Sequence, residues 1–303
     1  MNIKLLSQRY KIYNYNIGLT RATPTDVIDG NLDLCKVHWL KHNYYDRMFA
    51  DPFILKETNT TLEILVEESL FLGGAASLVK LTICTRTFKL LNRKTILSIG
   101  NHLSYPYIFF HDNAIYVLPE NIASNKLMLY RYDEAKEKCV YVKTLLDIPV
   151  SDPNIIYING KYWLFGGKKG TDQEELYLWC SDCIFGDYYP QEGVCVKENI
   201  RGSRMAGDFF RIGEQLYRPS QDCLEHYGAG TIVWKVDTIS LANYKETEAA
   251  TLYPQLNSTY PDGIHTLNFS ANWCVIDGLH IKPDFWRGAL LRLNAKFRLN
   301  LFD

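Results

Sequence analysis

Four polar residues stand at the starts of short β-rich runs and have side chains suited to acid–base chemistry. They are Asp51, Tyr105, Asp152 and His265, and each aspartate is followed by a proline. Two carboxylates held together in a partly desolvated site have their pKa values pushed apart, which suits chemistry on a glycosidic bond. The structural alternative is that each Asp-Pro pair forms a turn in which the aspartate caps its own backbone.

The runs that begin with these residues repeat along the chain. Their starts, with a looser copy at Gly207 and a last one at Gly263, lie about fifty residues apart, and short strands repeating at this period are typical of propeller blades. Each interval has room for four strands rich in Tyr, Val, Ile and Leu. The sequence therefore predicts an all-β fold, a five-bladed β-propeller over residues 1–283, with the N-terminal segment supplying a strand that closes the ring.

The propeller prediction brings the polar residues together, because the first strand of each blade lines the central channel. We therefore expect Asp51, Tyr105, Asp152 and His265 to converge on one funnel. Glu67 and Glu68 close the first predicted hairpin and are interpreted as a solvated edge.

Residues 284–303 depart from the blade pattern. Apolar residues recur there at helical spacing, with four cations among them and no acidic residue between Asp284 and Asp303. A basic amphipathic helix can lie on an anionic membrane surface. The pattern predicts a short C-terminal amphipathic helix with peripheral membrane contact through 285–302. The alternative is a helix that packs against the propeller and keeps its cations in water.

Composition restricts the partners and the compartment. The formal net charge of −1 gives no overall attraction to nucleic acid, so no nucleic-acid partner is expected. The N-terminus lacks the apolar core of a signal peptide, and the eight cysteines lack the dense spacing of a secreted disulfide scaffold. These features predict a cytoplasmic protein, at most peripheral at the inner membrane face, and neither a cofactor nor a metal is expected.

Five short motifs, taken as an ordered set, resemble a known family. They resemble the propeller domain at the N-terminus of plant glucosamine inositolphosphorylceramide transferases. That domain belongs to the five-bladed superfamily of arabinanases, xylosidases, invertases and levansucrases. The motifs cover residues 49–53, 102–106, 118–120, 218–222 with 227–228, and 262–266.

The resemblance implies roles for the acidic residues. In the arabinanase-like hydrolases, the aspartate at the first blade start is the general base, which implies that role for Asp51. The aspartate at the third blade start tunes the pKa of the acid, which implies that role for Asp152. The glutamate signature of the acid itself is missing here, and Glu120 and Asp222 are candidate substitutes. Its absence puts ordinary hydrolysis in doubt.

The motifs also suggest side chains that bind substrate. Arg218 is a candidate to clamp a phosphate or carboxylate, although an ion pair between blades explains it equally well. The last-blade histidine of the hydrolases binds a metal or a sugar hydroxyl, and we expect His265 to bind a hydroxyl. The full set of predicted binding residues is His102, Tyr105, Arg218, Gln221 and His265.

Three functions follow from these residues. The leading hypothesis is a carbohydrate-active protein of surface-glycan assembly that transfers a glycosyl group from an activated sugar, such as a sugar nucleotide, or from a lipid-linked glycan. The second is an arabinanase-like glycoside hydrolase that uses Asp51 with Glu120 or Asp222. The third is a non-catalytic sugar-binding or scaffold propeller, which would retain funnel carboxylates without the acid.

Overall fold

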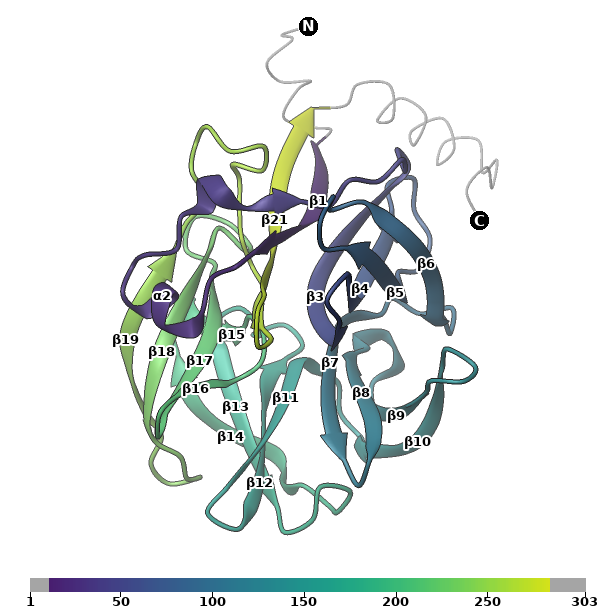
Figure 1. The fold of residues 1–303 in the computed structure, drawn as a ribbon. Helices are drawn as coiled ribbons and strands as arrows, with labels where there is room; N and C mark the ends of the chain where they lie inside the picture. The colour runs from purple at the N-terminus through teal and green to yellow at the C-terminus, as the bar shows by residue number, and fades with distance from the viewer. Residues whose placement is uncertain (1–10, 284–303) are drawn as a thin grey trace, which may run out of the picture.

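Five antiparallel sheets surround a central axis in the computed structural model, which describes residues 11–283 (Figure 1). The first blade contains β3 (Arg47–Glu57), β4 (Thr61–Leu70), β5 (Ser77–Cys84) and β6 (Leu90–Leu97); the second contains β7 (Ser104–His111), β8 (Ala114–Glu120), β9 (Leu127–Asp133) and β10 (Lys138–Leu146). The third contains β11 (Val150–Ile158), β12 (Lys161–Lys168), β13 (Glu175–Ser181) and β14 (Tyr189–Glu198). The five-bladed, all-β prediction is confirmed.

The last two blades depart from this pattern. The fourth contains β15 (Arg201–Met205), β16 (Phe210–Ile212), β17 (Gln215–Asp222), β18 (Gly230–Thr238) and β19 (Lys245–Leu252). The fifth contains β20 (Leu267–Phe269), β21 (Cys274–Pro283), β1 (Lys11–Thr20) and β2 (His38–Trp39). The fifth blade therefore joins strands from both ends of the described chain.

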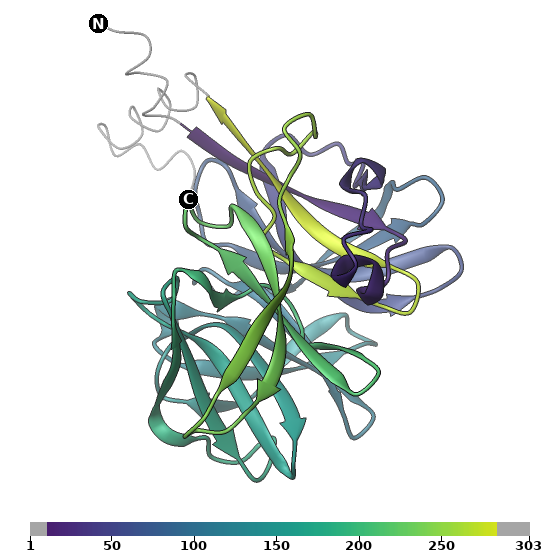
Figure 2. The same ribbon diagram turned by 90° about the vertical axis from the view of Figure 1, so that its left-hand side faces the viewer.

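The ring is closed by β1 lying antiparallel to β21, side by side in both ribbon views (Figures 1 and 2). All ten residues of β1 have register partners, from Lys11 opposite Pro283 to Thr20 opposite Cys274. Ile17 and Leu19 of this strand are fully buried. The apolar face of β1 thus contributes to the core as well as to the sheet edge.

The inner strands of the first three blades break register at the same place. Each has a bulge, and the residue in it has a left-handed backbone: Asp51 with φ 53°, Tyr105 with φ 46° and Asp152 with φ 46°. Side chains other than glycine adopt this region rarely and at a cost, and bulges re-aim side chains. In the fourth blade the inner strand is interrupted between β15 and β16, where Gly207 has φ 133°.

Helical structure is sparse in the described chain. Residues 11–283 contain one α-helix, α2 (Pro24–Ile28), and two 3₁₀ segments at Leu34–Lys36 and Ile122–Ser124. No helix in this range has the length and apolar character needed to cross a bilayer. The amphipathic helix expected over 284–303, with its membrane contact through 285–302, lies outside the described residues.

Candidate functional site

The three bulge residues place their backbone N–H groups at the axis, where carboxylates of the preceding blade accept them. Asp277 Oδ2 accepts from Asp51 N at 3.1 Å, and Asp51 Oδ2 accepts from Tyr105 N at 3.0 Å. Glu120 Oε2 accepts from Asp152 N at 3.0 Å. The side chain of Asp51 therefore bonds the neighbouring blade and not its own backbone, so the self-capping interpretation of the Asp-Pro pairs is wrong for this residue.

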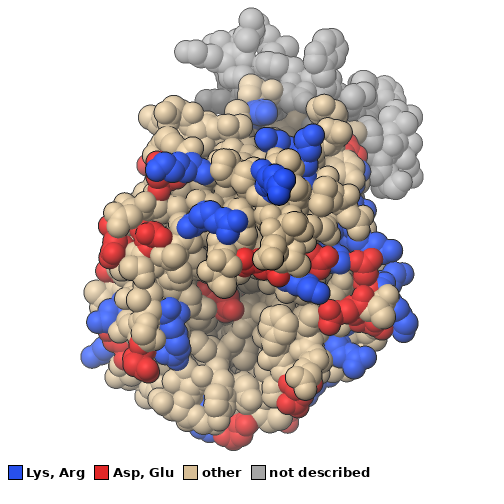
Figure 3. All heavy atoms as spheres, viewed as in Figure 1, with Lys and Arg blue, Asp and Glu red and all other residues tan. Residues whose placement is uncertain are grey.

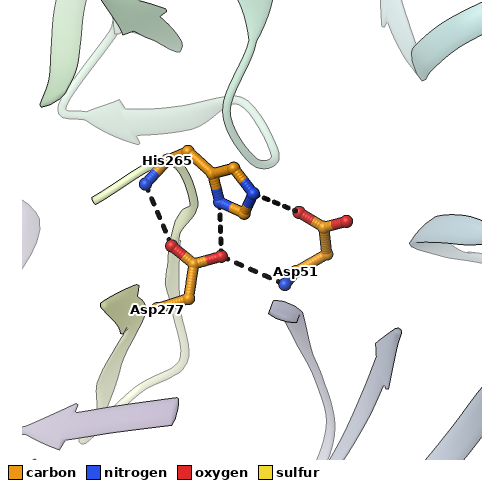
Figure 4. A group of neighbouring side chains, drawn as sticks. All are labelled: Asp51, His265 and Asp277. Carbon is orange, nitrogen blue, oxygen red and sulfur yellow. Dashed lines mark hydrogen bonds and ion pairs between the residues drawn. The ribbon is translucent and has the colours of Figure 1, made fainter. Parts of the chain in front are cut away.

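Asp51, His265 and Asp277 form one buried group (Figure 4). His265 Nδ1 lies 2.5 Å from Asp277 Oδ2, and its Nε2 lies 3.8 Å from Asp51 Oδ1. The backbone N–H groups of His265 and Thr266 donate to Asp277 Oδ1, and the Thr266 hydroxyl donates to Asp51 Oδ1 at 2.9 Å. The imidazole is thus held between two carboxylates from different blades.

This geometry shifts the pKa values of all three groups. Burial alone would lower the pKa of His265, but the charges of Asp277 and Asp51 raise it to about 9. Burial raises the pKa of Asp51, and the imidazolium of His265 partly opposes that effect. Burial also disfavours the ionised form of Asp277, yet the charge of His265 and its hydrogen bonds keep the pKa of Asp277 below its ordinary value. Imidazolium and carboxylate stabilise each other here.

Asp51, His265 and Asp277 also form the cluster of possible metal ligands within residues 11–283. Each offers one ligand atom, and these three atoms lie within 4.8 Å of one another. A histidine that ligates a metal must offer a neutral ring nitrogen. With its pKa raised to about 9 and Nδ1 bonded to Asp277, His265 carries a proton on both nitrogens at neutral pH. The donor set therefore suits an ion pair better than a cation site.

Arg204 forms the second half of the site. Its Nε lies 2.7 Å from Asp152 Oδ2, one terminal nitrogen lies 3.1 Å from Glu120 Oε2, and the other pairs with Asp172. Burial raises the pKa of Asp152, and the charge of Arg204 opposes this increase. Gln221 Nε2 also donates to Asp152 Oδ2, at 3.1 Å. One buried guanidinium thus neutralises carboxylates from the second and third blades.

Glu67 is buried, and its interpretation as a solvated edge is wrong. The register sets Glu67 opposite Ala50, the residue before the first bulge, well inside β4 and away from the hairpin turn. Its side chain is 8% exposed, and burial together with the charge of Asp51 raises the pKa of Glu67 to about 8. Glu68, on the opposite face of β4, is also buried and pairs with Arg47 and Arg93.

Tyr15, on the closing strand β1, covers the imidazole of His265. The two rings stack with centroids 4.5 Å apart, and the ring of Tyr227 meets His265 edge-on at 5.5 Å. The Tyr15 hydroxyl is buried and has no hydrogen-bond partner in the structure. A buried unpaired hydroxyl is costly, so this donor is a candidate to meet a ligand.

Two predicted residues are not available to a ligand at the axis. Arg218 is fully buried and its guanidinium bonds Glu246 of the same blade at 2.6 and 2.8 Å, so Arg218 does form an ion pair, but within one blade and not between blades. Asp222 bonds the Tyr253 hydroxyl at 2.5 Å and lies 3.2 Å from Arg201. These contacts engage Asp222 with Tyr253 and Arg201 at the end of β17.

The other predicted residues meet at or beside the axis. The Tyr105 hydroxyl crosses to the third and fourth blades, 2.7 Å from Asn154 Oδ1 and 3.0 Å from the carbonyl oxygen of Gly207, and it accepts from Gly207 N. The His102 side chain is 56% exposed and its Nε2 lies 3.4 Å from Glu67 Oε1. On the face of the molecule seen in Figure 1, the space-filling view of Figure 3 shows a hollow near the middle with acidic side chains beside it.

Five blades around buried acidic residues, an arginine and a histidine define a β-propeller with an ionisable site on its axis. The fold is similar to the catalytic domain of a Coprinopsis cinerea GH62 α-L-arabinofuranosidase, with a TM-score of 0.57 and 11% identity over 76% of this chain and 90% of that one. RS223-β-xylosidase gives a TM-score of 0.54 and 10% identity over 79% and 96%. At these identities the similarity concerns the fold alone.

The sequence comparison shows the family. The family model described as glucosamine inositolphosphorylceramide transferase 1, N-terminal, matches residues 34–259, and the chain belongs to this family. Glucosamine inositolphosphorylceramide transferase 1 of Oryza sativa subsp. japonica is 27% identical over 238 residues, which cover 76% of this chain and 30% of the relative. The Arabidopsis thaliana protein of the same name is 33% identical over 156 residues, 48% of this chain and 20% of the relative. The chain thus spans less than a third of the length of these relatives.

Proposed function

We propose that this chain is a carbohydrate-active propeller whose axial site transfers a glycosyl group to an acceptor hydroxyl during the assembly of a surface glycan or glycolipid. The relatives that share its family are named as transferases of glucosamine to inositolphosphorylceramide, which supports a sugar substrate and a hydroxyl acceptor. The observation that carries the proposal is the group formed by Asp51, His265 and Glu67, buried carboxyls beside an imidazolium.

In this proposal Asp51 is the base that takes the proton of the acceptor hydroxyl. The positive charge of His265, 3.8 Å away, favours the ionised form of Asp51 that a base requires. Asp277 holds the imidazole ring in place through Nδ1. Asp152 acts through the electrostatic field of its carboxylate at the axis. Arg204 pairs with this carboxylate and fixes its position.

A sugar-binding propeller without turnover is the second candidate, and one observation favours it. Both carboxylate oxygens of Asp51 already accept hydrogen bonds, Oδ1 from Thr266 and Oδ2 from Tyr105 N. A base engaged in this way must exchange one of these bonds for the acceptor hydroxyl. In a binding module Asp51 keeps both bonds, and other groups at the axis hold the sugar.

The variant Asp51→Asn separates these candidates, because it keeps the shape of the side chain and removes the base. We expect a loss of turnover of about 10²-fold or more, as for a positioned base, with a melting temperature within a few degrees of wild type. The assay follows release of nitrophenol from aryl glycosides of the common pentoses, hexoses and glucosamine, with products identified by mass spectrometry.

Asp187→Asn, at an exposed aspartate of the third blade, is the matched control and should behave as wild type. Unchanged turnover in Asp51→Asn would place the chemistry elsewhere. Sugar binding by calorimetry without turnover in wild type would support the binding module.

A further inference from the structure

We infer that Glu67 is the proton donor of the axial site, and that the sugar donor is an O-glycoside and not a sugar nucleotide. The inference rests on the proposed function and selects among the donors that it leaves open.

Glu67 occupies a position that the second blade also uses for an acidic residue at the axis. It lies opposite Ala50, immediately before the bulge of the first blade, as Glu120 lies opposite Ser104 in the second. The carboxylate of Glu120 bonds the bulge residue of the next blade. Among the hydrogen bonds of the described residues, Glu67 makes no such bond; its Oε1 accepts from the Ser69 hydroxyl at 2.8 Å.

Glu67 therefore matches Glu120 in position but does not link its blade to the next one through a hydrogen bond to the bulge residue. The charged and titratable groups near its carboxyl come from three strands and two loops: Asp51 on β3, Glu120 on β8, Tyr15 on β1, and His265 and His102 on the loops before β20 and β7. Burial and the charge of Asp51 raise the pKa of Glu67 to about 8, so the carboxyl carries a proton at neutral pH. The surroundings of the two carboxyls differ: His265 and the hydrogen bonds from Thr266 and Tyr105 favour the ionised form of Asp51, whereas burial and the charge of Asp51 disfavour the ionised form of Glu67.

A ligand is also indicated independently of the acidic residues. Tyr15 is 5% exposed, and its hydroxyl has no hydrogen-bond partner among residues 11–283. This hydroxyl lies near Asp51, Asp277 and Glu67. A sugar hydroxyl beside these carboxyls would satisfy this buried donor. The unpaired Tyr15 hydroxyl therefore points to the same space as the Glu67 carboxyl.

His102 connects the buried acid to solvent. Its Nε2 lies 3.4 Å from Glu67 Oε1, and its side chain is 56% exposed whereas that of Glu67 is 8% exposed. A proton lost from Glu67 can therefore return through the imidazole of His102 without opening the core. A purely structural buried carboxyl has no need of such a route.

The transfer step balances with these groups. The bond between the anomeric carbon and the leaving oxygen breaks, its electron pair stays on that oxygen, and the oxygen takes the proton of Glu67. The acceptor hydroxyl oxygen bonds the anomeric carbon and gives its proton to Asp51. Glu67 ends as a carboxylate and Asp51 as a carboxylic acid, so the net charge is unchanged; solvent then returns one proton to Glu67 and takes one from Asp51.

The need for an acid identifies the donor. An alkyl oxygen leaves a sugar only when it is protonated, which is the task of the general acid in glycosyl chemistry. A phosphate leaving group is already a stable anion at neutral pH and needs no proton. A buried carboxyl that stays protonated at neutral pH therefore suits a donor linked through a sugar or lipid alcohol oxygen.

The test compares Glu67→Gln with wild type on glycosides whose leaving groups differ in basicity. Alkyl glycosides need protonation of the leaving oxygen, 4-nitrophenyl glycosides need it less, and 2,4-dinitrophenyl glycosides do not need it. We expect Glu67→Gln to lose about 10²-fold or more on the alkyl glycosides, to lose less on the 4-nitrophenyl glycosides, and to keep most activity on the 2,4-dinitrophenyl glycosides. His102→Ala should slow turnover of the alkyl glycoside less than Glu67→Gln does. In the infrared spectrum at neutral pH, the band of a protonated carboxylic acid should be present in wild type and lost in Glu67→Gln.

Glu68→Gln is the matched control, since its side chain lies on the opposite face of the same strand in an ion pair with Arg47 and Arg93. It should keep the leaving-group dependence of wild type even if it lowers stability. If Asp51→Asn abolishes turnover of all glycosides while Glu67→Gln matches wild type on the alkyl glycosides, the inference fails and the proposed function stands. If wild type releases no phenol or alcohol from any glycoside of the panel, both fail.

Discussion

Arg204 is the residue on whose charge the acidic half of the site depends. Its guanidinium is 7% exposed and pairs with carboxylates of Asp152, Glu120 and Asp172, which come from the second blade and two parts of the third. Several buried carboxylates repel one another unless a cation lies among them. Removing one partner from a buried ionic group leaves uncompensated charge and is strongly destabilising.

We predict that Arg204→Gln lowers the free energy of unfolding at pH 7 by about 3–5 kcal/mol. The loss should be smaller at pH 5, because burial raises the pKa of Asp152 and its protonated form needs no cation. Urea unfolding at both pH values measures the difference. Arg211→Gln is the control, since Arg211 is exposed and, among the hydrogen bonds of residues 11–283, its side chain bonds only the carbonyl oxygen of Glu214. Equal stability of Arg204→Gln and wild type would show that the carboxylates are neutral without it.

At the residue scale, the sequence identifies Asp51, Asp152 and His265 but misses Glu67 and Asp277. Asp51, Asp152 and His265 are recognisable because a repeat aligns the blade starts, and the structure places them at the axis. Glu67 and Asp277 lie on second strands, where alternation alone does not say which face is the axis. Register fixes the face, that of Glu67 opposite Ala50 beside the bulge and that of Asp277 opposite Ile17 of β1, and register is set by pairing that a single sequence does not show.

The strand β1 is the element on which ring closure depends. It pairs along all ten residues with β21, and it carries Tyr15 over the site and Ile17 and Leu19 into the core. Without β1 the long edge of β21 is unpaired and its apolar face is exposed. Burying each large aliphatic or aromatic side chain contributes about 2–5 kcal/mol.

We predict that deletion of residues 1–20 removes about 5 kcal/mol or more of stability, enough to abolish a cooperative unfolding transition in a protein of ordinary stability. Thermal unfolding followed by near-ultraviolet circular dichroism measures the effect. A synthetic peptide of residues 11–20 should restore the transition, and the same peptide with Ile17 and Leu19 changed to Asp should not. A truncated protein that unfolds like the full chain would show that β21 needs no partner.

At the element scale, the repeat predicts the number of blades but not their irregular parts. The fourth blade begins at Arg201, on β15, and not at Gly207, which lies in the gap before β16. The repeat does not indicate Arg204, because this residue precedes Gly207, the apparent start of the blade. The fifth blade has an inner strand of only three residues, Leu267–Phe269, too short to show a periodic pattern.

Across the whole molecule, a net charge of −1 conceals an unusual concentration of buried charge at the axis. Asp51, Asp152, Asp277, Arg204 and His265 are all buried, and each comes from a separate part of the chain. Their protonation states are therefore set by folding, and folding must in turn depend on pH.

The direction of that dependence follows from the groups that titrate near neutral pH. Folding raises the pKa of Glu67 from 4.5 to about 8 and that of His265 from 6.5 to about 9. Between these values the native state binds more protons than the unfolded state, so stability must fall as pH rises. Groups with a lowered pKa act in the opposite direction: Asp277 does so only in acid, below its ordinary value of 3.8, and Lys197, whose pKa burial lowers to about 8, does so only from about pH 8 upwards.

We predict that the melting temperature of wild type falls by several degrees between pH 6 and pH 9, and that Glu67→Gln falls less over the same range. The amide cannot ionise, so the variant loses only the part of the decrease that Glu67 causes and keeps the part that belongs to His265. Differential scanning calorimetry at intervals of half a pH unit measures both curves. The melting curve of Glu68→Gln against pH should run parallel to that of wild type, because the Glu68 side chain that it replaces is ion-paired with Arg47 and Arg93. A melting temperature that rises towards pH 9, or parallel curves for wild type and Glu67→Gln, would mean that Glu67 is ionised in the folded protein, and the proton donor would have to be sought elsewhere on the axis.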